Sequence, residues 1–331
     1  MAPLERVLKF GPANRGRESG DGVTMVQQAV SRWLITGAGG QLGTDLQSVL
    51  AARAAGAAGG AEPDVQVRAV GSRELDITDA VAVAAMVDDF GPDVVINAAA
   101  YTAVDDAEEA QPQAYLVNAT GPAVLASALA RAGGRLIHVS TDYVFAGDGS
   151  RPYETTDEPA PRSAYGRTKL AGERAVRELL PDSSYVVRTA WVYGATGANF
   201  VKTMARLEHQ RDTVSVVADQ QGSPTWSADL ARALVELGGS AAPAGLYHCT
   251  NGGDTTWFGF TQAIFEELGA DPARVLPTTT DAFPRPAPRP AYSVLADTAW
   301  RDAGLTPMPP WRDALREAFA SAPEAFRAPP S

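Results

Sequence analysis

The segment SAYGRTKLAGE, residues 163–173, contains a tyrosine and a lysine four positions apart. If the segment is helical, Tyr165 and Lys169 lie on one face with their Cβ atoms about 6 Å apart. An ammonium group at that spacing favours the phenolate, so it would lower the pKa of the phenol from its usual value of about 10. The pair is therefore suited to acid–base chemistry. The alternative is an ordinary surface helix on which both side chains are solvated.

Two hydroxyl residues precede this helix in the chain. Ser140 and Thr141 follow the apolar run RLIHV, within the segment HVSTDYVFAG. A hydroxyl at the end of a buried strand can polarise a substrate carbonyl, while a phenol donates the proton that the developing alkoxide needs. A nicotinamide cofactor would supply the hydride. Either hydroxyl, together with Tyr165 and Lys169, therefore predicts the reduction of a ketone.

A glycine-rich turn indicates where such a cofactor would bind. The segment TGAGGQLG places Gly37, Gly40 and Gly43 between an apolar run and a helical stretch. Glycines there allow a tight turn and close approach of the backbone to a pyrophosphate, which the N–H groups of the following helix then bind. The spacing is G-x-x-G-x-x-G rather than G-x-G-x-x-G, although Gly39 supplies an intermediate glycine. This turn predicts a dinucleotide site.

The end of the second apolar run indicates which dinucleotide is bound. An acidic residue there would accept hydrogen bonds from a ribose 2′-hydroxyl and repel a 2′-phosphate. The run continues as VRAVGSRELD, with Gly71, Ser72 and Arg73 at the turn and no carboxylate in the immediate position. Arg73 and Ser72 could hold a phosphate, or Arg73 could be a solvated turn residue. We predict NADPH as the cofactor, with NADH as a usable second.

Strands and helices that alternate along the chain must position these residues. The apolar runs RWLIT, VQVRAV, DVVINAA, RLIHVS and SYVVRTA are separated by helical stretches at about 41–55, 79–91, 108–132 (bent near TGP) and 163–180. Continuous apolar runs between helices are typical of a parallel sheet that is covered on both faces. We therefore predict an α/β fold with a doubly wound (Rossmann) sheet, in which ligands bind at the carboxyl ends of the strands.

The pattern loosens after Trp191, where proline and glycine become more frequent. We predict an NAD(P)-binding Rossmann domain over residues 30–190 and a smaller substrate-binding lobe over 191–325, with part of 213–249 returning to the main sheet. Residues 1–29 are polar and rich in glycine, so we expect a flexible N-terminal extension.

The composition limits the classes of partner. The chain has 331 residues, 45% of them hydrophobic and 20% charged, and a net charge of −11. Such a charge argues against nucleic acid or an anionic membrane as partner. No apolar run approaches the about 18 residues of a membrane-spanning helix. Cys249 is the only cysteine, so no intramolecular disulfide can form. We expect a cytoplasmic enzyme or binding protein.

Other chemistries have little support in the sequence. His138, His209 and His248 are scattered, and no H-x-x-x-H or C-x-x-C spacing occurs, so we predict no metal site. Cys249 follows His248 in GLYHCTN, which we interpret as a buried strand rather than a site with a cysteine nucleophile.

From Arg32 to about Phe319 the sequence resembles the extended short-chain dehydrogenase/reductase family. The motifs that carry the resemblance are GAGGQLG, LDITD, PDVVINAAAYTAVDDAE, VNATGP, IHVSTDYVFAGD, SAYGRTKLAGE, VVRTAWVYG, DQQGSPT and FPRPAPRPAYSVL. The last six, in that order, are specific to the nucleotide-sugar reductase branch. The resemblance implies reduction of the 4-keto group of a dTDP-4-keto-6-deoxy sugar, dTDP-4-dehydro-L-rhamnose, by NADPH.

The resemblance also implies roles for individual residues. Tyr165 would donate the proton, Lys169 would orient it and hold the nicotinamide ribose hydroxyls, and Thr141 would bond the substrate carbonyl. Asp142 and Trp191 would face the deoxysugar, although a turn cap and a core tryptophan are the respective alternatives. The implied cofactor contacts include Gly40, Gln41 and Leu42 at the pyrophosphate, Asp76 and Ile77 at the adenine end, Ala100, Tyr101 and Thr102 at the central ribose, and Val139.

Arg285 and Arg289, in the proline-rich segment FPRPAPRP, could grip the substrate diphosphate or could be solvated. Some family members form metal-linked dimers through carboxylates at the subunit contact. This chain has Trp226, Ser227 and Ala228 where a carboxylate is expected, which argues against a metal link, while a homodimer stays open.

Two other functions are compatible with the resemblance. One is reduction of a different dTDP-4-keto sugar, as in a dihydrostreptose-type synthase. The other is a non-catalytic regulatory subunit of the same fold, which the intact set of Thr141, Tyr165 and Lys169 weakens.

Overall fold

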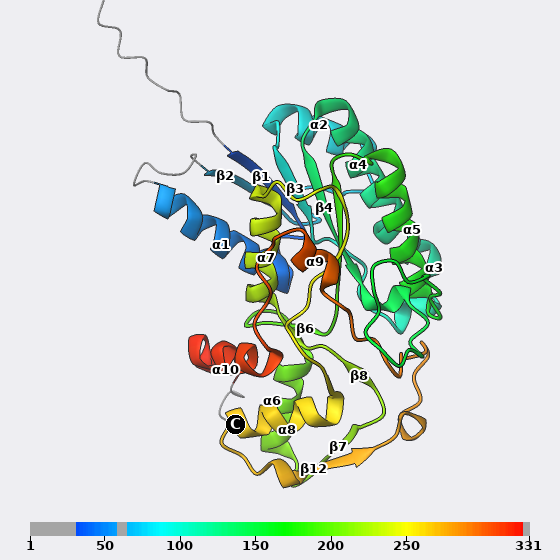
Figure 1. Cartoon of the computed structure of the whole chain (residues 1–331), viewed down its shortest axis with the longest axis vertical. Helices are drawn as coiled ribbons and strands as arrows, with labels where there is room; N and C mark the ends of the chain where they lie inside the picture. The colour runs from blue at the N-terminus through cyan, green and yellow to red at the C-terminus, as the bar shows by residue number, and fades with distance from the viewer. Residues whose placement is uncertain (1–30, 58–64, 327–331) are drawn as a thin grey trace, which may run out of the picture.

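The computed structural model describes residues 31–57 and 65–326, so the expected N-terminal extension lies outside the described residues (Figure 1). Six parallel strands form the main sheet, in the order β10-β5-β4-β3-β1-β2. Their bounds are β1 Ser31–Thr36, β2 Val65–Val70, β3 Val94–Asn97, β4 Arg135–Thr141, β5 Ser184–Thr189 and β10 Gly245–His248. The strand order reverses between β1 and β3, as in doubly wound sheets. The predicted fold class is confirmed.

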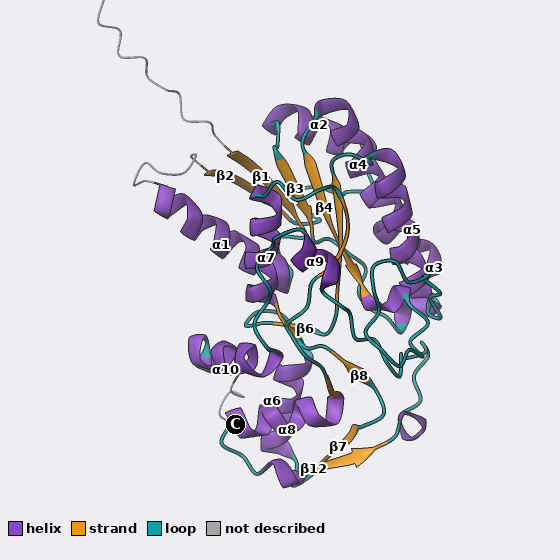
Figure 2. Ribbon diagram, in the orientation of Figure 1, coloured by secondary structure: helices purple, strands orange, loops and turns teal. Residues whose placement is uncertain are grey.

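Helices cover both faces of this sheet (Figure 2). One face carries α2 (Ala80–Phe90), α4 (Gly121–Ala132) and α5 (Ala164–Leu179), and the other carries α1 (Gln41–Ala57), α7 (Ser227–Gly239) and α9 (Thr298–Asp302). Successive residues of a strand point to opposite faces. In β1, Trp33 and Ile35 accordingly pack with α1 and α7, and Leu34 packs with α2 and α4. Because both faces are buried at the centre of the sheet, β3 is buried along its whole length, whereas the edge strand β2 exposes Gln66 and Val67.

Local capping determines where the helices begin and end. Asp79 Oδ1 accepts the N–H groups of Val81 and Ala82 at the start of α2, and Gly91 ends that helix with a φ of 58°. Ser163 Oγ accepts the N–H of Gly166 at 3.1 Å and so starts α5. This cap places Tyr165 in the first turn of the helix.

The helical stretch expected over residues 108–132 is built from several pieces. They are a 3₁₀ turn at Asp106–Glu108, α3 at Gln111–Tyr115, a π-helical turn at Leu116–Thr120, and α4. The π turn packs closely on α5, since a Cβ added to Gly172 would lie 2.1 Å from the carbonyl oxygen of Asn118. The expected bend near TGP coincides with the change from π to α geometry.

The lower part of the molecule is a separate helical lobe with its own core (Figure 1). Its helices are α6 (Phe200–Gln210), α8 (Trp257–Glu267), α10 (Trp311–Ser321) and α11 (Pro323–Phe326). Short strands pair in twos: β7 (Val214–Val217) with β12 (Val275–Thr278), β6 (Val192–Tyr193) with β9 (Thr225–Trp226), and β8 (Gln221–Gly222) with β11 (Thr255–Thr256). Three further 3₁₀ turns span Asp142–Val144, Pro272–Arg274 and Thr280–Ala282.

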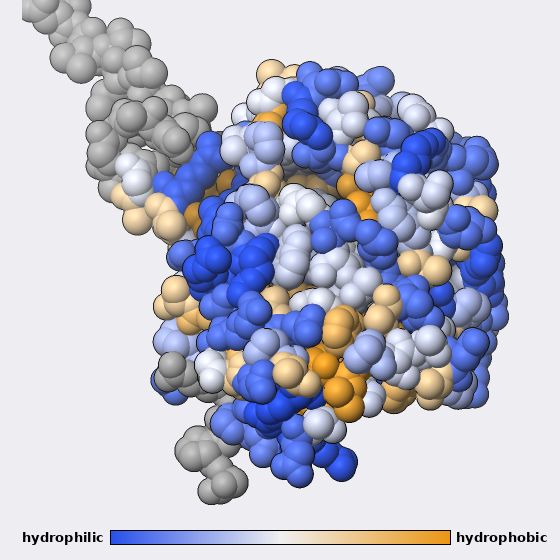
Figure 3. All heavy atoms as spheres, turned by 60° about the horizontal axis from the view of Figure 1, so that its bottom comes forward, coloured by the Kyte–Doolittle hydropathy of each residue, from blue (hydrophilic) through white to orange (hydrophobic). Residues whose placement is uncertain are grey.

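Figure 3 shows the molecule with the lower end of Figure 1 brought towards the viewer. Hydrophilic residues dominate this face, and hydrophobic residues gather in one area of it. In the described part of the chain, no helix combines the length and the apolar character needed to cross a membrane.

Candidate active site

A cavity of about 1000 Å³ lies along the carboxyl ends of the central strands. Its walls come from the turns after β1, β2 and β3, from the end of β4, from the first turns of α5, and from the lobe. The strand ends are where the fold predicts a ligand. Nearly all the residues that the sequence proposes for catalysis, cofactor or substrate line this one cavity.

The glycine turn after β1 can be built only with glycine at two positions. Gly37 has a φ of 74°, and a Cβ there would lie 2.6 Å from the N atom of Ala99. A Cβ on Gly43 would lie 2.2 Å from the carbonyl oxygen of Gly37. Gly40 N–H closes the turn by donating to the same oxygen at 3.0 Å. The turn thus leads directly into the first turn of α1.

This end of the cavity fits the pyrophosphate of a dinucleotide. Gln41, Leu42 and Gly43 form the first turn of α1 and line the cavity. The first N–H groups of a helix have no partner within the helix and carry a partial positive charge, so they bind phosphate oxygens. Two buried oxygens elsewhere in the wall, Asp142 Oδ2 and Thr189 Oγ1, have no hydrogen-bond partner among the described residues. Both belong to residues that line the cavity.

The turn after β2 carries charges of both signs. Ser72 and Arg73 line the cavity, and the guanidinium of Arg73 has no protein partner within the ranges that the structure describes. The chain turns back at Gly71, whose N–H donates to Glu74 Oε2 at 2.9 Å. The turn thereby brings the Glu74 carboxylate to the end of β2. No carboxylate was expected there, because Glu74 stands four residues after Val70, the last residue of the strand. Asp76 and Ile77 also line the wall here.

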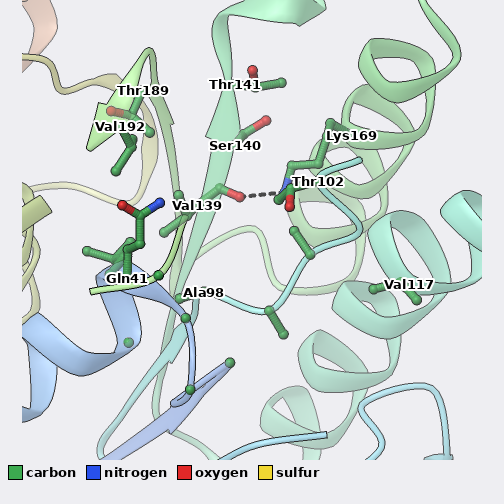
Figure 4. Close-up of a pocket in the computed structure, with 18 of the residues that line it drawn as sticks. Gln41, Ala98, Thr102, Val117, Val139, Ser140, Thr141, Lys169, Thr189 and Val192 are labelled. Atoms are coloured by element: carbon green, nitrogen blue, oxygen red, sulfur yellow. Dashed lines mark hydrogen bonds between the residues drawn. The ribbon is translucent and has the colours of Figure 1, made fainter. Parts of the chain in front are cut away.

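Thr141, Tyr165 and Lys169 meet on one wall of the cavity. Thr141 ends β4, Tyr165 lies in the first turn of α5, and Lys169 follows one turn later. The Nζ atom of Lys169 donates to the carbonyl oxygen of Val139 at 2.6 Å (Figure 4). Only 2% of Lys169 is exposed, so the ammonium is held between helix and strand.

The electrostatics of this wall differ from the expectation that Lys169 lowers the pKa of the phenol. Burial raises the pKa of Tyr165 to about 12, against a smaller lowering by the Thr141 hydroxyl. Burial also lowers the pKa of Lys169 to about 8, although the Glu173 carboxylate opposes this change. The expectation was wrong because loss of solvation outweighs the influences that favour the phenolate, and because Nζ is bonded to Val139.

Asp142 follows Thr141 and is 3% exposed. Thr141 Oγ1 donates to Asp142 Oδ1 at 2.9 Å. Burial raises the pKa of the Asp142 carboxyl to about 6, and the nearby hydroxyls of Ser293 and Thr141 limit the rise. The Thr141 hydroxyl and the Asp142 carboxyl therefore act as one hydrogen-bonded unit in the wall.

A buried ion pair, which the sequence did not suggest, supports the wall from behind. Arg188 Nε and Nη2 donate to Glu173 Oε1 and Oε2 at 2.9 and 2.7 Å, and Ser140 Oγ donates to Glu173 Oε1 at 2.5 Å. Glu173 lies one turn after Lys169 on α5, and Arg188 lies on β5. The Ser140 hydroxyl is thus bonded to a carboxylate that is already paired with Arg188, whereas the Thr141 hydroxyl donates to Asp142, which itself lines the cavity.

Two aromatic residues of the wall also escaped the sequence analysis. Tyr143 meets Tyr165 edge to face at a centroid distance of 5.7 Å, and it stands two residues after Thr141 in an already recognised motif. Trp257 stacks on Trp191 with a centroid distance of 3.5 Å. Trp257 begins α8 in the lobe, so no local signal connects it with the motifs of the sheet domain.

Three of the residues that the sequence proposes for cofactor or substrate do not line the cavity. The backbone of Tyr101 is bonded in both directions by the side chain of Asn118. Arg289 pairs with Asp105 at 2.7 Å and donates to a neighbouring carbonyl. Arg285 is exposed. The remaining residues proposed for cofactor or substrate lie in the wall, namely Gly37, Gly40, Gln41, Leu42, Gly43, Ser72, Arg73, Asp76, Ile77, Ala100, Thr102, Val139, Asp142 and Trp191.

Residues that could support other chemistry are not arranged for it. Among the described residues, no group of three or more His, Cys, Asp or Glu side chains could hold a metal ion. Burial raises the pKa of the Cys249 thiol, and the residue is 2% exposed. A thiol in this environment is a poor nucleophile.

Comparison with known proteins places these features in a family. A family model described as RmlD substrate binding domain matches residues 31–323. A dTDP-4-dehydrorhamnose reductase of Streptomyces griseus is 53% identical over 292 residues, which cover 87% of this chain and 93% of that protein. A probable dTDP-4,6-dihydroxy-2-methyloxan-3-one 4-ketoreductase of Streptomyces antibioticus is 50% identical over 290 residues, which cover 87% and 94%.

Among solved structures, the dTDP-4-dehydrorhamnose reductase of Bacillus anthracis in complex with NADP is similar with a TM-score of 0.83. It is 39% identical to this chain, and the match covers 88% of this chain and all of that one. The resemblance drawn from the motifs is thereby confirmed. With a family model that spans most of the sequence and relatives at least 50% identical over most of their length, the chain belongs to the RmlD substrate binding domain family.

Proposed function

We propose that the protein reduces the 4-keto group of dTDP-4-dehydro-L-rhamnose to give dTDP-L-rhamnose, with NADPH as the preferred cofactor and NADH as a second. One observation carries the proposal. Thr141, Tyr165 and Lys169 lie together on the wall of a cavity that begins at the glycine turn. The names of the Streptomyces griseus and Bacillus anthracis relatives support the same activity.

The cofactor would bind from the glycine turn towards Tyr165. The N–H groups at the start of α1 would hold its pyrophosphate, and Ser72 with Arg73 would hold a 2′-phosphate. Lys169, whose ammonium is fixed by Val139, would bind the ribose hydroxyls beside the nicotinamide. A bound nicotinamide supplies the hydride that reduces the carbonyl carbon.

The chain itself would supply the proton. Tyr165 carries its phenolic proton near neutral pH, since burial raises its pKa to about 12. As the carbonyl oxygen gains negative charge it becomes more basic than the phenolate, so the proton passes from Tyr165 Oη to that oxygen. The positive charge of Lys169 one turn away stabilises the phenolate that remains.

Thr141 and Asp142 would position the sugar. The Thr141 hydroxyl donates to Asp142 Oδ1, and on substrate binding it would donate to the 4-keto oxygen instead. Asp142 Oδ2 has no partner among the described residues, so it can accept a hydroxyl group of the sugar. Trp191 would close the sugar site from the lobe, which we propose as the substrate-binding unit over residues 191–325.

The decisive experiment measures NADPH consumption by the purified protein with dTDP-4-dehydro-L-rhamnose and identifies the product by NMR. Formation of dTDP-L-rhamnose is the expected result. If no sugar nucleotide with a 4-keto group is reduced while the protein binds NADPH, the proposal is wrong and a non-catalytic subunit becomes the better description.

A second candidate substrate has one specific observation in its favour. The Streptomyces antibioticus relative, at 50% identity, is named for a different dTDP-linked 4-ketone. A comparison of kcat/KM for the two sugar nucleotides distinguishes the candidates, because the physiological substrate is expected to have the higher value. We also expect a cytoplasmic location and no metal link between subunits, while a homodimer stays open; sedimentation in the presence and absence of a chelator tests the oligomeric state.

A further inference from the structure

Trp191 has a backbone conformation that tryptophan rarely adopts. Its φ is 49°, and within the described residues it is the only residue other than glycine with a positive φ. A bulky residue in this region is strained, and such a conformation persists only where the surroundings hold it. The question is which contacts hold Trp191 in place.

The indole of Trp257 covers one side of the Trp191 ring. The two rings are nearly parallel, with an interplanar angle of 7° and a centroid distance of 3.5 Å. Trp257 is in turn packed against Phe200, at a centroid distance of 4.3 Å. It is the first residue of α8, whose start is capped by Thr256 Oγ1. Trp257 is therefore a rigid support.

Gly222 provides the clearance that the Trp191 ring needs. A Cβ added to Gly222 would lie 2.5 Å from Cε2 of Trp191 and 2.7 Å from Cζ2 and Nε1. Gly222 pairs in register with Thr255, and Thr256 of the same strand directly precedes Trp257. The antiparallel pair of β8 and β11 thus places both Gly222 and the start of α8, where Trp257 lies, next to the Trp191 ring.

Both indoles remain accessible from the cavity. Trp191 and Trp257 line its wall and are only partly buried. Within the part of the chain that the structure describes, neither indole N–H donates to a protein acceptor. The pair therefore presents an aromatic surface and polar edges to a ligand.

We propose that Trp257 is a positioning residue for the sugar substrate. It holds the Trp191 indole in its strained conformation, and the stacked pair forms a platform for the apolar face of the deoxysugar ring. Gly222 is part of the same device because any larger residue there would displace the ring. The part of this inference that concerns the sugar depends on the proposed function, whereas the part that concerns the stack does not.

The test uses two variants that act from different elements. Trp257→Ala removes the support, and Gly222→Ala pushes on the ring without changing either tryptophan. Both are expected to raise the KM for the sugar nucleotide about tenfold while kcat and the Kd for NADPH change less than about threefold, because neither variant alters Thr141, Tyr165, Lys169 or the glycine turn. Trp311→Phe, which removes a tryptophan of the same lobe outside the stack, is the control.

A spectroscopic measurement reports the stack without substrate. Two parallel indoles at this distance are expected to give exciton-coupled circular dichroism, which both Trp257→Ala and Gly222→Ala should diminish and Trp311→Phe should retain. If Trp257→Ala does not fold, Trp257→Phe keeps a ring in the stack and is expected to give a smaller rise in KM with loss of the coupled signal.

The outcomes separate this inference from the proposed function. If both variants lose the coupled signal but keep the KM for the sugar, the platform does not bind substrate and the inference is overturned while the proposed function stands. If the coupled signal survives in Gly222→Ala, Gly222 does not set the position of the ring and the inference is also overturned. If the wild-type protein reduces no 4-keto sugar, the proposed function and the sugar part fail together, and the spectrum of Gly222→Ala, which keeps both indoles, still decides whether Gly222 sets the position of the Trp191 ring.

Discussion

Lys169 Nζ lies 2.6 Å from the carbonyl oxygen of Val139, so the lysine of α5 is bonded to the strand that carries Thr141 (Figure 4). This bond fixes the distance between the helix that holds Tyr165 and the strand that holds its partner hydroxyl. It also directs the ammonium to the middle of the cavity wall, although the residue itself is almost fully buried.

Replacement of Tyr165 by phenylalanine tests the proton donor. The change removes one oxygen and leaves the ring packing, so folding and NADPH binding should survive while kcat falls by roughly 10²–10⁴. Steady-state kinetics and the Kd for NADPH check this. Tyr115→Phe, at a residue that is 53% exposed and outside the cavity, is the matched control. A Tyr165→Phe enzyme within about threefold of wild type would exclude the mechanism.

Lys169 should make cofactor binding sensitive to pH. Because burial lowers the pKa of its ammonium to about 8, the charge is present below that pH and is lost above it. The Kd for NADPH of the wild-type protein should therefore rise as the pH passes through about 8. Lys169→Met should bind NADPH weakly at every pH, and its kcat should fall. An unchanged Kd in Lys169→Met across this range contradicts a role for the ammonium at the ribose.

The cofactor preference should depend on the two opposite charges after β2. Arg73→Ala should raise the KM for NADPH more than that for NADH, because only NADPH carries the 2′-phosphate. Glu74→Gln keeps an acceptor for the Gly71 N–H but removes a negative charge, so it should shift the preference towards NADPH. Equal effects of Arg73→Ala on both cofactors would remove Arg73 from the phosphate site.

The Asp142 carboxylate should lower the free energy of unfolding near neutral pH, because the side chain is buried in the cavity wall. Its pKa is raised to about 6 in the folded protein from 3.8. Between these values the folded state binds more protons than the unfolded state, so the free energy of unfolding falls as the pH rises, by up to about 3 kcal/mol. The isosteric Asp142→Asn does not titrate. It should therefore have a higher Tm than wild type at pH about 7 and no such advantage at pH about 4.

Thermal unfolding at the two pH values measures this difference, with Asp88→Asn on the surface of α2 as the control. A Tm difference between Asp142→Asn and wild type that does not change with pH would contradict the raised pKa.

The buried ion pair of Glu173 and Arg188 should contribute to the free energy of unfolding. Glu173→Gln leaves the Arg188 guanidinium, which is 2% exposed, without its charged partner, and should cost about 3–5 kcal/mol of folding free energy. The double variant Glu173→Gln with Arg188→Met removes the unpaired charge and should recover much of the loss. Chemical denaturation measures both, and equal losses in the single and the double variant would contradict this explanation.

Local features of the sequence determined the frame of the site. The spacing of Tyr165 and Lys169 places both on one face of a helix whatever surrounds them, because that follows from the helical repeat. Gly43 is required by its contacts with Gly37 and Ala38 in the same turn, and Gly37 by its positive φ, although Gly37 also packs against the distant Ala98 and Ala99. The alternation of apolar runs and helical stretches was sufficient to predict the parallel sheet. The carboxyl ends of parallel strands lie at one edge of a sheet, so Thr141 lies at the same edge as the glycine turn.

Only the tertiary structure decided the features that depend on residues far apart in the chain. The pKa of Tyr165 rises because many segments together exclude water from it, and no spacing in the sequence reports that burial. Arg289 belongs to Asp105 rather than to the cavity because two loops meet, and Trp191 keeps its strained conformation where Trp257 and Gly222 meet it. Periodicity is a property of neighbouring residues, whereas solvation and packing are set by whichever distant residues the fold brings into contact.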